Sequence, residues 1–383
     1  MRLHVGIFSE SYTPVVNGVS VSIETLTREL EKRGHRVSIF APSFAGYRDS
    51  RPDVYRFASL RTRAMPDYPI AWPPGYSLFE RFGQLKLDII HTHTPFIVGT
   101  AGLGWAEATN VPIVSTNHTH YSEYVHYFKG PRAFWRAIVV GWMRMYYNRC
   151  AAVIVPSENT GLRLESYGIK TPWRAIPTGI QLETGKDTVM NPRERFAIDK
   201  SDRLLVFVGR IAREKNLDLL LEAFQRIQVA IPVARLMIVG GGPNLDDYKQ
   251  LAQMSGLANR VTFTGPIPRN QLSCVLNDAE LFVFPSLTET QGLAVGEAAF
   301  CGVPAVAVRS GGIPEFIRDG QTGYLVNNSV EEFAGRVIEL MLDEVKRKSF
   351  SDEAKRFAQA LSVDAMTDKI LGVYDMAIGR SRC

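Results

Sequence analysis

The run of residues 284–307 contains the residue types best suited to bind a charged, hydroxyl-rich ligand. A buried strand is expected to end at Pro285, followed by a loop of small residues and a helix that stops at Gly302. The first backbone N–H groups of a helix have no partner within it, so they form an anion site for a phosphate or a sugar oxygen. The residues at this predicted helix start are Gln291, Gly292 and Leu293.

Two carboxylates accompany this predicted anion site. Glu289 precedes the helix and Glu297 lies within it. Each carboxylate can accept two hydroxyl hydrogen bonds, so the pair suits a polyol. Taken singly, the two could be a loop-capping and a surface glutamate. Together, beside the small-residue loop, they favour a ligand.

A second charged cluster follows the strand expected at 204–209. Arg210 would leave the carboxyl end of that strand, and Lys215 would lie at the start of the next helix. Two cations at one sheet edge can hold a diphosphate leaving group and stabilise the charge that develops as its bond breaks. Arg213, between them, is interpreted as part of a solvated basic turn.

In the first half of the chain, Gly18 and His118 follow predicted strands. Gly18 lies in the loop after the first strand, where a glycine can bring backbone N–H groups onto a phosphate. His118 would stand at the carboxyl end of a strand at 112–116. A lone histidine is more often structural than catalytic, so the role of His118 must be judged from the residues around it. His91 and His93 end an earlier strand, and we expect them to have packing roles.

These residues must be positioned by sheet edges, and the sequence predicts two sheets. Short β-branched strands alternate with helical stretches such as 19–33 and 216–230, and a segment without a strong period, 177–203, separates the two series. Such alternation predicts parallel sheets covered by helices. We therefore predict an α/β protein with two doubly wound domains that face a central cleft, and ligands at the carboxyl ends of the strands. The strands are expected at 3–8, 36–41, 87–91, 112–116, 152–155, 204–209, 236–239, 261–263, 281–284 and 304–308.

The composition excludes several classes of protein. A chain of 383 residues is long enough for two domains, and 45% hydrophobic with 22% charged residues is a globular balance. No apolar stretch approaches the ~20 residues of a membrane span, and the N-terminus reads as a strand rather than a signal peptide. The four cysteines have no metal or redox spacing. We expect a protein of the reducing cytoplasm.

The net charge of +5 is unevenly distributed along the chain. Residues 1–180 hold 20 Lys and Arg against 13 Asp and Glu, whereas the remainder holds 24 against 26. A basic half could face an anionic membrane, nucleic acid or a phosphorylated ligand. On charge alone, ordinary surface variation explains the difference, and no other feature supports nucleic-acid binding.

Taken together, these residues resemble the retaining GT-B glycosyltransferases of family 4, over essentially the whole chain. The resemblance implies a GT-B fold with an N-terminal acceptor-side domain at 1–180, rejoined by a C-terminal helix at 364–383, and a nucleotide-sugar-binding domain at 181–363. It is carried by Glu289 and Glu297 with seven residues between them, Gly209-Arg210 with Lys215, Pro285-Ser286, Gly302-Val303-Pro304, Asn17-Gly18-Val19, the His118 region and Pro177-Thr178-Gly179-Ile180.

The resemblance implies a hexosyltransferase whose donor is a nucleotide diphosphate sugar. By that resemblance Arg210 and Lys215 hold the diphosphate, and Glu297 binds the ribose. Gly18 would approach the phosphate from the other domain.

The same resemblance assigns the transferred sugar to a second group of residues. Glu289 contacts the sugar, and His118 interacts with its primary hydroxyl. The backbone that assists Glu289 belongs to Gln291, Gly292 and Leu293.

The resemblance also implies a mechanism with retention, in which the leaving phosphate takes the acceptor proton and Glu289 is a sugar clamp rather than a nucleophile. No Asp-x-Asp run lies in a suitable loop, since Asp246-Asp247 falls in a predicted polar helix. We therefore expect the cations and the helix start to replace a metal, with the nucleotide sugar as co-substrate and no cofactor. Gly241 and Gln181 stand where the family usually has acidic residues, which puts the choice of donor in doubt.

The acceptor is suggested by a helix expected at 131–149, which mixes Trp, Tyr and Arg residues. Aromatic and basic residues together suit a membrane interface, but apolar residues run nearly all round the helix, as in a buried core helix. A Pro- and aromatic-rich segment at 61–79 is either a binding loop or a solvated connector.

Further similarity favours the membrane. Ser9-Glu10-Ser11-Tyr12 with Pro14, and His118-Thr119 with Tyr121 and Tyr124, resemble the diacylglycerol glucosyltransferase branch of the family. We thus expect UDP-glucose as donor, a lipid acceptor such as diacylglycerol, and peripheral binding to anionic lipid at the inner face of the cell membrane.

Three alternatives belong to other classes. A GDP-mannose-dependent mannosyltransferase could act on a phosphoinositide or a soluble acceptor. A non-catalytic nucleotide-sugar-binding module is disfavoured because Arg210, Lys215, Glu289 and Glu297 occur together. A dinucleotide oxidoreductase is disfavoured because Ser-Glu-Ser-Tyr-Thr-Pro, not a Gly-x-Gly-x-x-Gly turn, follows the first strand.

Overall fold

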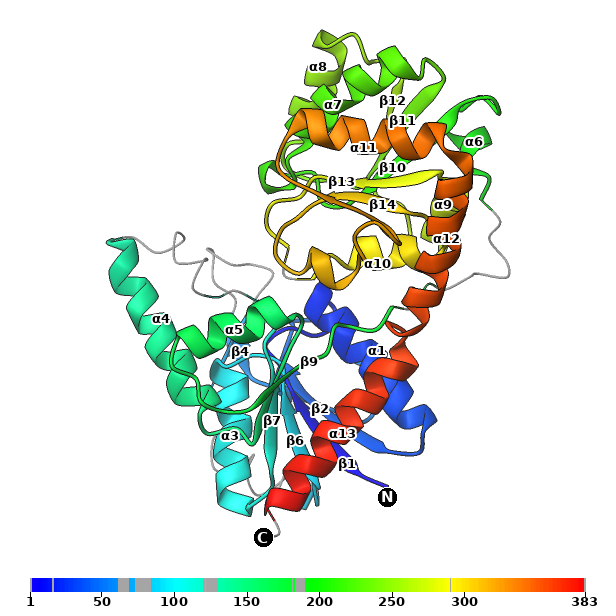
Figure 1. The fold of residues 1–383 in the computed structure, drawn as a ribbon. Helices are drawn as coiled ribbons and strands as arrows, with labels where there is room; N and C mark the ends of the chain where they lie inside the picture. The colour runs from blue at the N-terminus through cyan, green and yellow to red at the C-terminus, as the bar shows by residue number, and fades with distance from the viewer. Residues whose placement is uncertain are drawn as a thin grey trace. The chain divides into compact units, whose positions relative to one another are not determined.

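The computed structural model divides the chain into two units. Unit 1 comprises Met1–Gly179 and Val363–Cys383, and unit 2 comprises Ile180–Ser362 (Figure 1). The structure describes residues 2–15, 17–60, 69–72, 84–119, 121, 130–180, 182, 190–289 and 291–381.

Unit 1 is built on a seven-stranded parallel sheet in the order β3-β2-β1-β6-β7-β8-β9. Its central strands are buried over their whole length, as expected for a parallel sheet with both faces covered. The strands are β1 (His4–Phe8), β2 (Arg36–Pro42), β3 (Val54–Phe57), β6 (Ile89–Thr92), β7 (Ile113–Thr116), β8 (Ala152–Val155) and β9 (Trp173–Ala175), with a separate antiparallel pair of β4 (Ser59–Leu60) and β5 (Ile70–Ala71).

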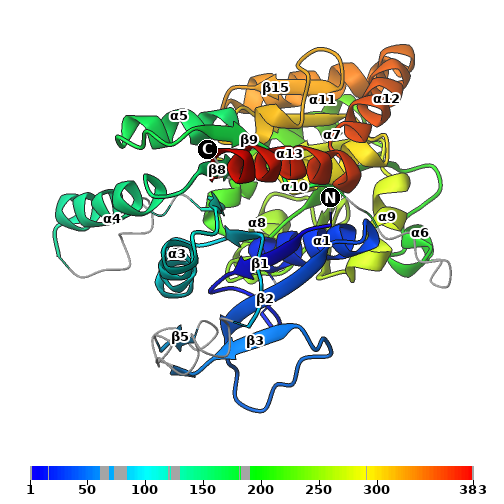
Figure 2. The ribbon, with the colours of Figure 1, turned by 90° about the horizontal axis from the view of Figure 1, so that it is seen from below.

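Two hydrophobic clusters place the helices of unit 1 on opposite faces of this sheet. Val5 and Ile7 of β1 pack with the first cluster, which includes α1 and α13, whereas Phe8 packs with the second, which includes α3 and the end of α4 (Figures 1 and 2). The side chains of a strand alternate between faces, so this division follows from the sequence of β1. The helices are α1 (Gly18–Lys32), α3 (Ile97–Thr109), α4 (Arg132–Tyr147), α5 (Glu158–Ser166) and α13 (Val363–Ser381).

Unit 2 repeats the architecture with a six-stranded parallel sheet in the order β12-β11-β10-β13-β14-β15. Its strands are β10 (Arg203–Val208), β11 (Ala234–Val239), β12 (Val261–Gly265), β13 (Leu281–Phe284), β14 (Ala305–Val308) and β15 (Gly323–Val326). Its helices are α6 (Pro192–Arg195), α7 (Leu217–Ala230), α8 (Leu245–Met254), α9 (Arg269–Asn277), α10 (Leu293–Phe300), α11 (Val330–Leu342) and α12 (Glu344–Gln359), with short 3₁₀ turns η2 (Arg213–Lys215) and η3 (Ile313–Glu315).

The predicted α/β class with two doubly wound sheets is confirmed, and each predicted strand is present within a few residues. The structure adds the edge strands β3, β9 and β15, which the sequence did not indicate. Most of the predicted 61–79 loop, and Gln181, lie outside the described residues.

The interpretation of the 131–149 helix as a buried core helix is wrong. Helix α4 forms as predicted, but only Met143, Tyr146 and Tyr147 are buried, all in its last two turns. The earlier turns present Phe134 and Ile138 to solvent, with exposed fractions of 58% and 46%. Because these side chains are exposed, packing in the core does not explain them.

Helix α3 begins against a carboxyl group supplied from elsewhere in the chain. Its N-cap residue, Phe96, offers no side-chain hydrogen bond. Instead, Glu10, which follows β1, accepts a 2.5 Å hydrogen bond from Val98 N at its Oε1, while its buried Oε2 has no hydrogen-bond partner among the described residues. Burial raises the pKa of Glu10 from 4.5 to about 7, against the opposing effect of backbone hydrogen bonds from Val98 and Gly99.

We expect this shift to make the free energy of unfolding depend on pH. The folded chain holds the Glu10 proton more tightly than the unfolded chain, so the stabilisation is present below the unfolded pKa of 4.5 and is lost as pH rises towards 7. Glu10→Gln removes this dependence. The variant should gain up to about 3 kcal/mol relative to the wild type between pH 5 and 8, measured by urea unfolding at each pH.

Glu107→Gln is the matched control, because Glu107 lies on α3, the helix whose start Glu10 contacts, and its side chain is 54% exposed. It should leave the pH dependence unchanged. If Glu10→Gln and the wild type show parallel pH profiles, the Glu10 carboxyl is ionised in the folded chain and the assignment is wrong.

Candidate active site

In unit 2, loops that follow neighbouring strands are tied together at the carboxyl edge of the sheet. Leu287 N, after β13, donates to Glu214 O, after β10, at 3.2 Å. Ser310 Oγ, after β14, donates to Ser286 O at 2.6 Å. The three loops therefore form one connected surface, as the carboxyl ends of adjacent parallel strands allow.

Glu289 is fixed in this surface and forms an ion pair with Lys215. Ser286 Oγ donates to Glu289 Oε1 at 2.8 Å, and Gly312 N donates to Glu289 O at 2.9 Å. Gly311 has a φ of +49°, and a Cβ there would lie 1.8 Å from Glu289 O. Only glycine allows this close approach, so the backbone at Gly311 and at Glu289 is tightly constrained.

The two predicted diphosphate ligands present unused donors. Arg210 leaves the end of β10 exposed, and it has no hydrogen bond or ion pair to any residue that the structure describes. Lys215 gives one N–H to Glu289, and an ammonium group has three. Both side chains can therefore donate to phosphate oxygens.

The start of α10 provides backbone donors at the same edge. Its N-cap is Gly292, whose φ of 85° lies in the left-handed region, and no side chain caps the helix. The helix geometry leaves the first N–H groups after Gly292, including that of Leu293, without intrahelical partners. Gln291 precedes the cap and is half-buried. This is the arrangement that the sequence predicted for binding a phosphate or a sugar oxygen.

Glu297 lies in α10 and is held separately from Glu289. It is 7% exposed, and its Oε1 accepts a 2.8 Å hydrogen bond from Arg269, on α9. Burial raises the pKa of Glu297, and the nearby Arg269 opposes this shift. No hydrogen bond joins Glu297 to Glu289 or Lys215. Glu297 is therefore paired with Arg269, and Glu289 with Lys215.

In unit 1, His118 is hydrogen-bonded to a second histidine. His118 Nε2 lies 2.8 Å from Nδ1 of His93, and the two rings stack with centroids 5.1 Å apart and planes 15° apart. Burial lowers the pKa of His118 to about 4, so its imidazole is neutral at pH 7. Its Nδ1 has no hydrogen bond to a described residue.

Gly18 is the first residue of α1, after the capping residue Asn17, whose Oδ1 accepts from Ser20 N at 3.0 Å. Gly18 is exposed, its φ is not positive, and a Cβ built there would meet nothing within 4 Å. Neither the backbone nor the packing of unit 1 requires a glycine at this position.

Sequence reasoning missed several polar groups at the carboxyl edge of the unit 1 sheet. His93 was expected only to pack, yet it contacts His118 and its buried Nε2 has no partner among the described residues. Asn117 Oδ1 and Glu10 Oε2 are also buried, and neither has a hydrogen-bond partner among the described residues. These residues follow β6, β7 and β1, which are neighbours in the sheet. The available signal was the spacing of His91 and His93 at the end of a predicted strand. Residues i and i+2 share a face of a strand, so two polar side chains there point the same way.

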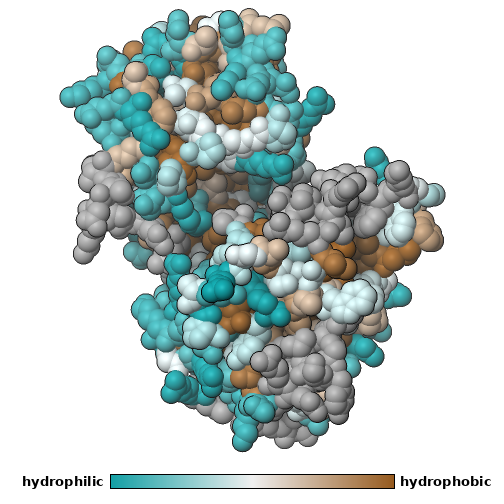
Figure 3. Space-filling model, turned by 180° about the vertical axis from the view of Figure 1, so that it is seen from behind, coloured by the Kyte–Doolittle hydropathy of each residue, from teal (hydrophilic) through white to brown (hydrophobic). Residues whose placement is uncertain are grey.

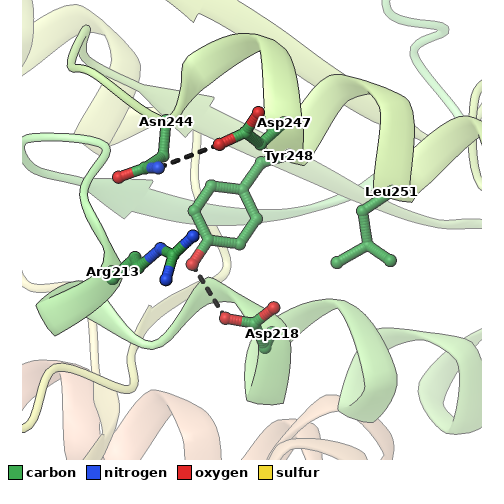
Figure 4. Close-up of a pocket in the computed structure, with 6 residues that line it drawn as sticks. All are labelled: Arg213, Asp218, Asn244, Asp247, Tyr248 and Leu251. Carbon is green, nitrogen blue, oxygen red and sulfur yellow. Dashed lines mark hydrogen bonds between the residues drawn. The ribbon is translucent and has the colours of Figure 1, made fainter.

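A pocket of about 430 Å³ lies beside η2, between the starts of α7 and α8 (Figure 4). Tyr248 OH donates to Asp218 at 2.8 Å, and Asn244 Nδ2 donates to Asp247 at 2.9 Å, so these polar groups satisfy one another. Arg213 borders the pocket and is exposed, in agreement with its interpretation as a solvated basic residue. None of the predicted donor ligands lines it.

Across the described part of the chain, no three His, Cys, Asp or Glu side chains gather in the manner of a metal site. The polar groups at the two sheet edges are instead two cations, carboxylates, neutral histidines and backbone donors. The cations and backbone donors of unit 2 can bind an anionic group, and its carboxylates can accept hydroxyl hydrogen bonds.

Comparison with known proteins identifies the family. Residues 191–357 match the model "Glycosyl transferases group 1", and residues 16–184 match "Glycosyltransferase Family 4". An alpha-monoglucosyldiacylglycerol synthase of Streptococcus pneumoniae strain R6 is 32% identical over 349 residues, covering 89% of this chain and 78% of that protein. A protein of the same name from Acholeplasma laidlawii is 28% identical, covering 86% of each chain.

The fold has close structural neighbours. The sucrose-phosphate synthase of Thermosynechococcus elongatus matches with a TM-score of 0.78 at 21% identity, over 99% of this chain and 100% of that one. At this identity the likeness shows the fold, which is GT-B. Together with the family matches, it confirms the resemblance: the chain belongs to glycosyltransferase family 4 and is a hexosyltransferase that uses a nucleotide sugar.

Proposed function

We propose that this enzyme transfers glucose from UDP-glucose to diacylglycerol at an anionic membrane surface, with retention at the anomeric carbon. The relatives from Streptococcus pneumoniae and Acholeplasma laidlawii are both named alpha-monoglucosyldiacylglycerol synthase. The observation that carries the proposal is the exposed apolar face of α4, on a helix that also has exposed arginines, because a soluble acceptor gives no reason for such a face.

The exposed face of α4 has the chemistry of a membrane interface. Phe134, Ile138, Trp142 and Met145 are spaced at three or four residues and are 58%, 46%, 38% and 40% exposed. Exposed arginines share the helix: Arg132, Arg136 and Arg144. Apolar side chains can enter the headgroup region while the guanidinium groups bind anionic lipid.

The loop before α3 extends this surface. Trp142 Nε1 donates to Pro95 O at 2.6 Å, which ties α4 to that loop. The next two residues, Phe96 and Ile97, are 37% and 39% exposed. Figure 3 shows hydrophobic residues gathered at the side of the molecule where α4 lies. No helix among the described residues is long and apolar enough to span a bilayer.

In the proposed donor site, Arg210 and Lys215 bind the diphosphate and neutralise its charge as the glycosidic bond breaks. The N–H groups at the start of α10 assist them, and no metal is needed for this neutralisation. Glu297, whose Oε2 has no described hydrogen-bond partner, accepts from the ribose hydroxyls. The open space at Gly18 supports a backbone approach to phosphate, since nothing within unit 1 accounts for the missing side chain.

In the proposed sugar site, Glu289 accepts from hydroxyls of the transferred glucose, beside the backbone of Gln291, Gly292 and Leu293. His118 contacts the primary hydroxyl. The leaving phosphate takes the proton of the acceptor hydroxyl as the new glycosidic bond forms on the same face. Glu289 is a clamp, because its pairing with Lys215 and Ser286 suits a fixed hydrogen-bond acceptor better than an attacking nucleophile.

The function is tested with UDP-glucose and diacylglycerol in anionic liposomes, with UDP release and lipid product measured by mass. Arg210→Ala and Lys215→Ala should each lower turnover by at least ~100-fold, as expected for loss of a contact to the leaving group. Arg213→Ala is the control and should remain near wild-type activity. Near-normal turnover in either of the first two variants would remove that residue from the donor site.

The wild-type result separates the alternatives. UDP release without a glycolipid retains the donor and rejects diacylglycerol. Transfer from GDP-mannose but not UDP-glucose would instead establish the mannosyltransferase alternative.

Membrane binding is tested on the α4 face. The double variant Phe134→Ser/Ile138→Ser should bind anionic vesicles at least ~10-fold more weakly in a sedimentation assay, because each buried apolar side chain contributes about 1.5–3 kcal/mol at most. Its donor hydrolysis in solution should be unchanged.

The matched control is Val229→Ser/Val345→Ser, which removes apolar side chains that are 86% and 83% exposed on α7 and α12 of unit 2. This variant should bind vesicles like the wild type. Equal binding by all three proteins would show that α4 is not the membrane contact.

A further inference from the structure

His93 is buried behind His118 and held in place from its other side. It is 1% exposed, and its ring lies against that of His91, with centroids 4.3 Å apart and planes tilted by 35°. His91 is itself fixed, because its Nδ1 lies 2.7 Å from Tyr374 OH and its Nε2 lies 2.7 Å from Thr116 Oγ1. Three histidine rings thus lie in a row that ends at His118, and Tyr374 of α13 contacts the ring of His91.

The hydrogen bond between His93 and His118 holds a single proton. Burial lowers the pKa of all three histidines, so each ring is neutral at pH 7 and has one N–H and one bare nitrogen. Among the described residues, the titratable groups that act on His93 are His91 and His118, and neither is a carboxylate. Either His93 Nδ1–H donates to His118 Nε2, or His118 Nε2–H donates to His93 Nδ1.

The unpartnered Nε2 of His93 decides between these arrangements. If His118 donates, His93 must place its own proton on Nε2, as a buried N–H without an acceptor. If His93 donates from Nδ1, its Nε2 is a bare lone pair. Buried N–H groups without a partner are rarer in proteins than under-satisfied acceptors, so the second arrangement is favoured. His118 then accepts at Nε2 and has its proton on Nδ1.

We propose that His93 is a positioning residue that holds His118 in the Nδ1–H tautomer, so that His118 presents an N–H donor at the carboxyl edge of the unit 1 sheet. Its ligand there is a hydrogen-bond acceptor, such as a sugar hydroxyl oxygen or a phosphoryl oxygen, and His118 does not remove a proton from the acceptor. The role in catalysis rests on the proposed function, whereas the tautomer does not.

The tautomer is measured directly on the full-length protein labelled with ¹⁵N-histidine, from long-range ¹H–¹⁵N correlations. The signals of His118 are assigned by their loss in His118→Gln. The wild type should show a protonated Nδ1 and a bare Nε2 on His118. A protonated Nε2 overturns the proposal, whatever the enzyme's substrate.

Two substitutions of His93 separate the hydrogen bond from packing. His93→Asn keeps an amide N–H close to the position of Nδ1, so the Nδ1–H signature of His118 should persist. His93→Leu fills similar space without a donor, so that signature should be lost. If His93→Leu does not fold, His93→Gln replaces it in this test. The glutamine amide reaches past the position of Nδ1, so this variant also has no donor there. Retention of the Nδ1–H form without the donor overturns the proposal.

The kinetic consequence is measured with UDP-glucose, by transfer or by donor hydrolysis. His93→Leu should lower kcat about tenfold or more with little change in KM, and His93→Asn should restore most of it. In a His118→Ala background, His93→Leu should cause no further loss, because the effect passes through His118. An undiminished loss in that background would show a merely structural role. An enzyme inactive with UDP-glucose refutes the proposed donor and leaves the tautomer measurement to decide this inference.

Discussion

The arrangement of this enzyme depends on one constraint, which is that parallel strands end at a common edge. In unit 2 this brings together Lys215 and Glu289, which are 74 residues apart in the sequence. In unit 1 it brings His93, after β6, against His118, after β7. The loops contribute reactive groups, but the register of β10 with β13 and of β6 with β7 sets the distances between them.

Much of the fold could be predicted because buried parallel strands leave a clear sequence signal. β1, β10 and β13 are apolar over most of their length, and each was predicted. The missed strands β3 and β9 lie at sheet edges, where side chains are only half-buried and the apolar signal is weak. Helix α4 could not be interpreted from its composition, because a core helix and a membrane-facing helix have the same residues. The exposure of Phe134 and Ile138 in the structure excludes a fully buried core helix.

The candidate site was predictable in its residue types but not in its pairings. Sequence motifs indicated Glu289, Lys215 and Glu297, whereas the partner of Glu297, Arg269, is on a helix with no motif of its own. His93 was expected to pack because one sequence does not show which strand ends will be neighbours. Pairings of this kind depend on sheet order, and sheet order is a property of the whole domain.

The two sheet edges carry different polar groups, and the proposed transfer reaction uses this difference. At the unit 2 edge, the partly exposed Lys215 and Glu289 form an ion pair, and Arg210 is exposed. The unit 1 edge removes charge, because burial favours the neutral forms of Glu10, His93 and His118. The cations of unit 2 therefore suit the diphosphate of the proposed donor. If an incoming hydroxyl met an ionised histidine, it would meet a group that donates at both nitrogens and cannot accept its proton. In the proposed reaction that proton goes to the departing phosphate, which is a base that the reaction itself produces.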